Sequence, residues 1–294
     1  MNYLCPTYLC PICAGPLSLQ DKSLACEQRH QFDLAKEGYV NLLPVQHKNS
    51  KNPGDNKEMM QARREFLDQG FYQSLSDKVN SIAQQALATV ETPHILDLGC
   101  GEGYYTHRLA QAITDASDAT ISNVDSTTVD NNQKLQIAGL DISKSAVRYA
   151  AKRYKSISFC VASAYATPFA DASQDLVTRI YAPSQNDELA RIIKADGYLI
   201  TVTPAAEHLF ELKQKIYQTP EKHDMEIEEI AGFYVVEQQR LTDEITLTQA
   251  KDSKNLLEMT PLAWKMSDEQ KAALYAADLT LTLDFNITLY KRTA

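Results

Sequence analysis

Four side chains near the start of the chain have the types and spacing of a metal site. Two residues separate Cys10 from Cys13, and after 12 more residues Cys26 and His30 follow with three residues between them. Three thiolates and one imidazole fill the tetrahedral shell of zinc, which favours a structural ion over a catalytic one. Such an ion would supply the folding free energy that a short segment without an apolar core lacks. Cys5 is an alternative ligand.

A second group of residues has the pattern of a nucleotide-binding turn. The apolar run 95–98, which contains Asp97, leads into Gly99, Gly101 and Gly103. Glycines in such a turn permit backbone conformations and a close ligand approach that a Cβ would block. The spacing differs from the G-x-G-x-x-G pattern of dinucleotide-binding proteins, and no phosphate-binding Lys-Ser/Thr pair follows. The D-x-G-x-G-x-G form instead resembles motif I of S-adenosylmethionine-dependent methyltransferases.

An acidic residue, Asp141, ends the next apolar run. In a Rossmann-like sheet, a carboxylate at this point accepts hydrogen bonds from both ribose hydroxyls of the cofactor. It lies 38 residues after Gly103, where roughly 20 are expected. The polar segment 115–134, interpreted as a surface insertion between a helix and a strand, accounts for most of the excess. The alternative is that Asp141 caps the helix that begins near Ser143.

The order of the apolar runs predicts the elements that position these residues. Five short runs alternate with helical stretches, and they occupy residues 94–99, 135–141, 157–162, 174–180 and 198–203. The helical stretches start after Gly103, Ser143, Asn186 and Ala205. Such alternation predicts a parallel, doubly wound sheet. Two terminal runs, 240–249 and 279–291, alternate polar with apolar residues, and only one helical stretch, 266–276, is expected between them. The prediction is an α/β, Rossmann-like fold with a mostly parallel seven-stranded sheet.

Three units are expected along the chain. Residues 1–44 form a zinc-binding module, here called the zinc module, which is interrupted by prolines and has no helical periodicity. Residues 45–92 contain a polar linker and two helices that are broken near Gly70, since their apolar positions recur at three and four. Residues 93–294 form the methyltransferase domain. The segment 161–169, after the third strand, is where this class places the adenine ring.

Composition sets limits on function. The chain has 294 residues, of which 44% are hydrophobic and 23% charged, which excludes disorder for most of it. No stretch approaches the roughly 18 apolar residues of a membrane span, and the N-terminus lacks a secretory signal, so we expect a cytoplasmic protein that binds no membrane. The net charge of −9 argues against general polyanion binding, but residues 1–64 carry +2. Cys100 and Cys160 are interpreted as small buried fillers.

With both motifs in view, the chain resembles the bacterial 23S rRNA (guanine-N1)-methyltransferase family, whose members modify a guanine in a domain II hairpin of large-subunit rRNA. The resemblance runs over essentially the whole chain. The residues that carry it are 10–13, 26–33, 35–48, 53–55, 59–64, 101–107 and 180–183. The segment 115–134 departs from the family. The resemblance implies a class I fold, S-adenosylmethionine as methyl donor, a structural zinc ion, and a homodimer whose zinc modules help to form a cleft for RNA.

The resemblance also implies individual residues. Zinc would be held by Cys10, Cys13, Cys26 and His30, and the cofactor would be contacted by Tyr72, Tyr105, Thr106 and His208, in addition to the motif I residues and Asp141. Tyr72 could instead pack on the sheet, and His208 could be a surface histidine. Tyr181, at the end of the fourth strand, could stack on a guanine turned out of the hairpin or could line the core.

Guanine N1 carries a proton that must leave during methylation, but the sequence identifies no general base. RNA phosphates are expected to meet the basic residues Lys36, His47, Lys48, Lys51, Arg63 and Arg64. Two alternatives remain open. One is a methyltransferase that acts on a small molecule, which the net acidity favours. The other is a noncatalytic zinc-dependent adaptor, against which the intact motif I and Asp141 argue.

Overall fold

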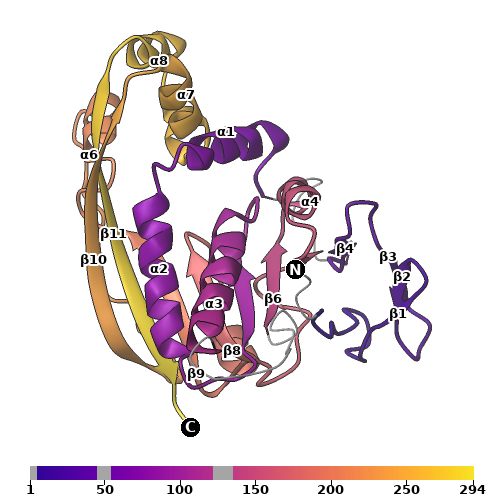
Figure 1. Cartoon of the computed structure of the whole chain (residues 1–294). Coiled ribbons are helices and arrows are strands. Elements are labelled where there is room, and N and C mark those ends of the chain that lie inside the picture. The colour runs from indigo at the N-terminus through magenta and orange to yellow at the C-terminus, as the bar shows by residue number, and fades with distance from the viewer. Residues whose placement is uncertain (1–4, 45–53, 122–134) are drawn as a thin grey trace.

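The computed structural model describes residues 5–44, 54–121 and 135–294. The polypeptide between His94 and the C-terminus forms a sheet with helices around it, and the zinc module lies to one side (Figure 1). In the described residues the sheet has the order β10-β11-β9-β8-β5-β6-β7-β4. The strands from β4 to β9 run parallel, whereas β11 is antiparallel to β9 and β10 is antiparallel to β11. This arrangement confirms the predicted Rossmann-like class.

The predicted runs correspond to strands. They are β5 (His94–Leu98), β6 (Gln136–Asp141), β7 (Ser158–Val161), β8 (Gln174–Ile180), β9 (Ile193–Pro204), β10 (Phe233–Leu247) and β11 (Leu279–Arg292). The sheet has one strand more than the seven predicted, because β4 (Val40–Asn41) of the zinc module pairs with β7. Two residues are too few to show a hydrophobic period, so the sequence could not indicate this strand.

The helices also follow the predicted pattern, with two differences. Those predicted are α1 (Lys57–Asp68), α2 (Gln73–Ala86), α3 (Tyr104–Ile121), α4 (Lys144–Arg153), α5 (Asn186–Ile192), α6 (Phe210–Ile216) and α8 (Asp268–Tyr275). The expectation of a single helical stretch between the last strands is wrong, since α7 (Ala250–Glu258) and the 3-10 helix η3 (Pro261–Lys265) precede α8. Helix α3 includes residues 115–121, which were predicted as part of an insertion; residues 122–134 lie outside the described part.

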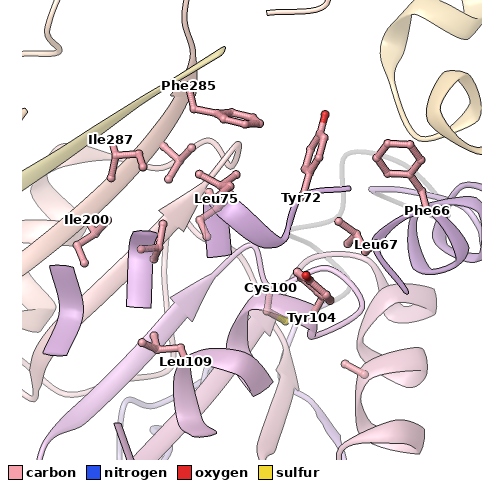
Figure 2. Close-up of a cluster of buried hydrophobic side chains, with 14 of the residues drawn as sticks. Phe66, Leu67, Tyr72, Leu75, Cys100, Tyr104, Leu109, Ile200, Phe285 and Ile287 are labelled. Atoms are coloured by element: carbon pink, nitrogen blue, oxygen red, sulfur yellow. The ribbon is translucent and has the colours of Figure 1, made fainter. Parts of the chain in front are cut away.

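Successive residues of the central strands point to opposite faces of the sheet. Ile95 packs into a cluster with residues of α1 to α4, and Figure 2 shows part of this cluster around Leu75, Leu109 and Ile200. Leu96 packs on the other face, with α5 and with the zinc module. Both faces of the parallel sheet are therefore covered, as its continuous apolar strands require.

The zinc module covers part of the second face, together with α5. Its three short strands, β1 (Ser18–Gln20), β2 (Ser23–Ala25) and β3 (Gln31–Asp33), form a separate antiparallel sheet. The ring of Tyr8 lies 5.5 Å from that of Phe169, and the amide of Leu9 donates a 2.8 Å hydrogen bond to the carbonyl of Pro168. The module is therefore docked on the same face that Leu96 enters.

Helix α1 lies across the carboxyl ends of the parallel strands, between α7 and α4 (Figure 1). Asn56 caps it, accepting a 2.9 Å hydrogen bond from the amide of Met59. The segment just before α1 is anchored at the end of β6, where Ser143 donates a 2.7 Å hydrogen bond to the carbonyl of Asp55. In α/β sheets, ligands bind at the carboxyl ends of the strands, so α1 adjoins the expected site.

Candidate metal centre and cofactor site

The four predicted metal ligands come together in the zinc module. The ligand atoms of Cys10, Cys13, Cys26 and His30 all lie within 4.8 Å of one another. The Sγ atoms of Cys13 and Cys26 are 3.6 Å apart, and His30 Nδ1 lies 3.5 Å from Cys10 Sγ. Zinc–sulfur bonds of about 2.3 Å in a tetrahedron place two sulfurs about 3.8 Å apart, so the donor set fits zinc.

Two tight turns present these ligands. After the first pair, Ala14 adopts a positive φ of 57° and its amide donates to the carbonyl of Cys10. In the second loop Arg29 has a φ of 65°, and its amide donates to the carbonyl of Cys26. Cys5 lies outside the cluster and is exposed, so the structure does not support it as an alternative ligand.

The glycine-rich turn follows β5 and meets the neighbouring strand closely. Gly99 has a φ of +78°, and a Cβ placed on it would lie 2.3 Å from the Cβ of Ala182, just beyond β8. Gly103, with a φ of +86°, lies against Ala150 of α4. Only glycine fits these two positions, because a side chain would clash and the backbone conformation is left-handed. Over Gly101 there is more room, with the nearest atom 3.7 Å from such a Cβ.

Asp141 faces this turn from the end of β6. One carboxylate oxygen accepts a 3.0 Å hydrogen bond from the amide of Gly101, and the other accepts a 2.7 Å bond from the amide of Ser143. Burial raises the pKa of Asp141. Ser143 is the residue that caps α4, through Ala146, so the alternative role of Asp141 as the helix cap is wrong.

Asp97 and Thr106 lie beneath the turn and support it. Asp97 is buried and accepts hydrogen bonds from the hydroxyls of Thr106 and Thr178, the latter at 3.0 Å. Burial raises its pKa to about 6. Since both carboxylate oxygens have partners inside the protein, the geometry favours a positioning role for these two residues over direct contact through their side chains.

Aromatic side chains from five segments gather beside the turn. The ring of Tyr72 lies 5.4 Å from those of Phe66 and Phe285, and its hydroxyl points away from the core (Figure 2). His208 lies 4.8 Å from Phe285 and 6.0 Å from Tyr181. Tyr181 has a φ of 55°, unusual for an aromatic residue, and is 44% exposed. Tyr72 and His208 are buried, so His208 is not a surface histidine.

The protonation state of His208 follows from its neighbours. Its Nδ1 accepts a 3.2 Å hydrogen bond from the amide of Asp284, which leaves the ring proton on Nε2, 3.5 Å from the hydroxyl oxygen of Tyr181. Burial lowers the pKa of His208 to about 3. The imidazole is therefore neutral near pH 7 and presents a hydrogen-bond donor to Tyr181, which makes it a poor proton acceptor.

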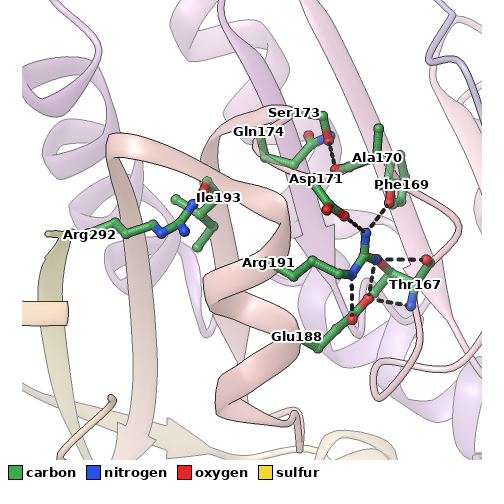
Figure 3. A network of polar contacts seen from close by, with 10 residues as sticks. All are labelled: Thr167, Phe169, Ala170, Asp171, Ser173, Gln174, Glu188, Arg191, Ile193 and Arg292. Atoms are coloured by element: carbon green, nitrogen blue, oxygen red, sulfur yellow. Dashed lines mark hydrogen bonds and ion pairs between the residues drawn. The ribbon is translucent and has the colours of Figure 1, made fainter. Parts of the chain in front are cut away.

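The segment after β7, expected next to the adenine ring, is held by an arginine of α5. Arg191 donates to the carbonyl of Phe169 and pairs with Glu188 and Asp171, each within 2.8 Å (Figure 3). Glu188 in turn accepts a 2.6 Å hydrogen bond from the amide of Thr167. This network fixes the segment from outside the site, so the segment is shaped before any ligand arrives.

The structure brings Arg63 of α1 into the site, where sequence analysis had assigned it to RNA. Its Nη1 is the atom nearest to the open side of Gly101, and its Nη2 forms a 2.7 Å ion pair with Asp55. One signal could have found it. Met60, Arg63 and Leu67 stand at i, i+3 and i+7, so the charge interrupts the buried stripe of the helix.

The other predicted RNA contacts lie in different surroundings or outside the described residues. Arg64 lies 3.7 Å from the buried Glu102 and stacks over Tyr149, so its charge is directed inward. Lys36 is exposed on the zinc module. His47, Lys48 and Lys51 lie outside the described residues.

In the parts of the chain that the structure describes, no helix is long and apolar enough to cross a membrane.

Comparisons with known proteins match both parts of the chain. A family model described as "RlmA, N-terminal" matches residues 8–51, and one described as "Methyltransferase domain" matches residues 90–260. The 23S rRNA (guanine(748)-N(1))-methyltransferase of Streptomyces fradiae is 30% identical over 288 residues, which cover 95% of either chain. A provisionally named 23S rRNA (guanine-N(1)-)-methyltransferase of Bacillus subtilis is 30% identical over 95% of this chain and 96% of its own. Another from Micromonospora griseorubida, also provisionally named, is 31% identical over 72% and 70%, respectively.

Proposed function

Because this chain belongs to the family of 23S rRNA (guanine-N1)-methyltransferases, we propose that it methylates N1 of one guanine in a domain II hairpin of 23S rRNA. One observation carries the proposal: the likeness to its named relatives extends through the zinc module as well as the sheet. A small-molecule methyltransferase needs only the sheet and its pocket, whereas a zinc module docked on the far face of that sheet offers a second surface for a large substrate.

S-adenosylmethionine is the methyl donor, and zinc is the structural ion of the zinc module. The sulfonium of the donor supplies an electrophilic methyl group, so the chain mainly has to align a nucleophile and exclude water. In this proposal the open side of Gly101 faces the donor, and the remaining lone pairs of Asp141 accept hydrogen bonds from its ribose hydroxyls. We propose that Tyr105 also contacts the donor and that Gly99 and Gly103 shape the turn through their close packing.

The acceptor base would enter beside the aromatic cluster. Tyr181 projects a partly exposed ring from the end of β8, and the Nε2 proton of His208 holds its hydroxyl. A flipped guanine can stack on such a ring. His208 itself stays neutral, because burial keeps its pKa at about 3, so it orients Tyr181 and does not take the N1 proton.

Recognition of the hairpin falls to the front of the chain. Residues 1–64 carry a net charge of +2 on an otherwise acidic protein, and Lys36 is exposed there. We further propose three units, residues 1–44, 45–92 and 93–294, and a homodimer in which two zinc modules border the RNA. Acting on rRNA would place the enzyme in the cytoplasm, where rRNA is found.

The test is methyl transfer from labelled S-adenosylmethionine to an unmodified 23S rRNA transcript by the zinc-loaded protein. We expect one methyl group per transcript and a reverse-transcriptase stop at one domain II guanine, because an N1 methyl group blocks base pairing. A matched transcript with adenine at that position should stay unlabelled. Labelling of a small-molecule extract without labelling of RNA would contradict the proposal, as would a methyl group elsewhere on the guanine.

A further inference from the structure

Neither the motifs nor the family comparisons give Arg63 a role in the cofactor site. Arg63 lies nearly two turns into α1, over the glycine-rich turn, and its Nη1 would be 3.7 Å from a Cβ on Gly101. Its positive charge acts on Asp141, Tyr72 and Tyr105 and lowers the pKa of each, against the larger rise that burial causes. The guanidinium therefore lies between the ribose-facing acid and the aromatic cluster.

The hydrogen bonds of Arg63 leave part of the guanidinium unused. Nη2 donates to the carboxylate of Asp55 at 2.7 Å and to the carbonyl of Met259 at 3.4 Å. Nε is buried and has no partner among the described residues, and Nη1 forms none of their hydrogen bonds. A buried N–H without a partner costs free energy, so a ligand that accepts from these donors would be stabilised.

The two partners of Nη2 hold the Arg63 side chain in place. Asp55 belongs to the segment anchored at the end of β6, where its carbonyl accepts from Ser143, two residues after Asp141. Met259 follows α7, and its carbonyl accepts from the same Nη2. Two segments thus fix Arg63, and the free donors of its guanidinium are preorganised before a ligand binds.

The charges around the site indicate which group of the ligand the free donors of Arg63 bind. Asp97, Asp141 and Asp55 are all acidic, which suits the sulfonium and the ammonium of the donor but repels its carboxylate. The neighbouring Arg64 is directed towards Glu102, 3.7 Å away, which also lies 3.8 Å from Arg153. Among the described residues, Arg63 is thus the cation beside Gly101 with donors to spare.

We propose that Arg63 binds the carboxylate of the methionine part of S-adenosylmethionine through its Nη1. Nη1 carries two N–H donors on a guanidinium that is always charged and is held in a fixed orientation, and a flexible lysine ammonium does not reproduce this placement. The two side chains of the turn itself, Cys100 and Glu102, are buried and include no cation, so the helix above the turn supplies one. The proposal rests on the proposed function, since it concerns the same donor.

The test compares two ligands by calorimetric titration of the zinc-loaded protein. One is S-adenosylhomocysteine, which keeps the carboxylate, and the other is its decarboxylated analogue, 5′-(3-aminopropylthio)-5′-deoxyadenosine. The wild-type protein should prefer the first by about 10- to 100-fold, the range of a charge-assisted hydrogen bond. Arg63→Gln should weaken S-adenosylhomocysteine by that factor and leave the analogue within about twofold, and Arg63→Lys should recover only part of the preference.

Two further variants separate this contact from general damage. Asp55→Asn removes the ion pair but keeps the arginine, so it should weaken S-adenosylhomocysteine by a smaller factor than Arg63→Gln and leave the analogue within about twofold. Arg148→Gln removes an exposed arginine of α4 that pairs with Glu37, and it should change the affinity for neither ligand. An Arg63→Gln protein that melts like the wild type and keeps the preference for the carboxylate would overturn the inference alone. A wild-type protein that binds neither ligand would overturn the proposed function as well.

Discussion

Strands β1 to β3 of the zinc module have three residues each, and β1 is exposed along its whole length, whereas four of the five residues of β5 in the main sheet are buried. The module instead gathers four ligand atoms within 4.8 Å. The two regions therefore depend on different forces: one on coordination of an ion, the other on burial of apolar surface. Each should respond to a perturbation that leaves the other largely intact.

Removal of zinc should produce the largest difference between the zinc module and the main sheet. Structural zinc supplies roughly 10–16 kcal/mol of apparent binding free energy in small domains, far more than three-residue strands can replace. A chelator, or Cys26→Ser, should therefore abolish hydrogen-exchange protection in β1 to β3, and the sheet should still bind S-adenosylhomocysteine.

The matched control for this prediction is Cys5→Ser, which should keep both zinc and protection because Cys5 lies outside the cluster. Equal loss of protection in β5 and β6 after zinc removal would mean that the two regions form a single cooperative unit.

Truncation of one apolar side chain in each region should give a smaller contrast. Ile137 of β6 is fully buried, and Ile137→Ala should lower the free energy of unfolding by about 2–5 kcal/mol through lost transfer free energy and a cavity. Leu19 of β1 is 66% exposed, so Leu19→Ala should change it by less than about 0.5 kcal/mol. Denaturant titration of both variants measures the difference; similar losses would refute the division between the regions.

The smallest expected difference concerns two glutamates and pH. Burial raises the pKa of Glu102 to about 7, although Arg153 and Arg64 oppose the shift, so its ionised form costs folding free energy that accumulates as the pH rises from about 4.5 to 7. Glu102→Gln should stabilise the protein at pH 8 by roughly 1–3 kcal/mol, and the gain should narrow towards pH 5. Denaturant titration at both pH values measures this gain.

Glu37 of the zinc module is the matched control. A hydrogen bond from Arg148 lowers the pKa of Glu37, so its ionised form favours folding at pH values above its ordinary pKa. Glu37→Gln should therefore bring no gain at pH 8. If Glu102→Gln proved destabilising at pH 8, the carboxylate would be stabilised by its two arginines and not strained by burial.

Much of the architecture was predictable because it depends on local pattern. The glycine turn, Asp141 and the four zinc ligands are recognisable from residue type and spacing, and the structure places each where the pattern predicts. The parallel arrangement of the central strands follows from the alternation of strands and helices, which permits few topologies. These features need little information about distant parts of the chain.

The features that sequence analysis missed depend on distant partners. The buried residues of α7 include Asp252, Ser253 and Asn255, so its inward face shows no apolar period. Strand β4 exists because β7 is there to pair with it. Arg63 reads as a surface charge until α7 and the turn are seen on either side of it. Polar burial of this kind is set by tertiary contacts, which local patterns do not contain.

The most direct test of the central claim is mass mapping of the methylated guanines in 23S rRNA from cells that lack this gene and from cells in which it is restored. Loss of a single N1-methylguanosine from a domain II hairpin, with recovery on restoration, is the predicted result. An unchanged methylation pattern would contradict the assignment of rRNA as the substrate.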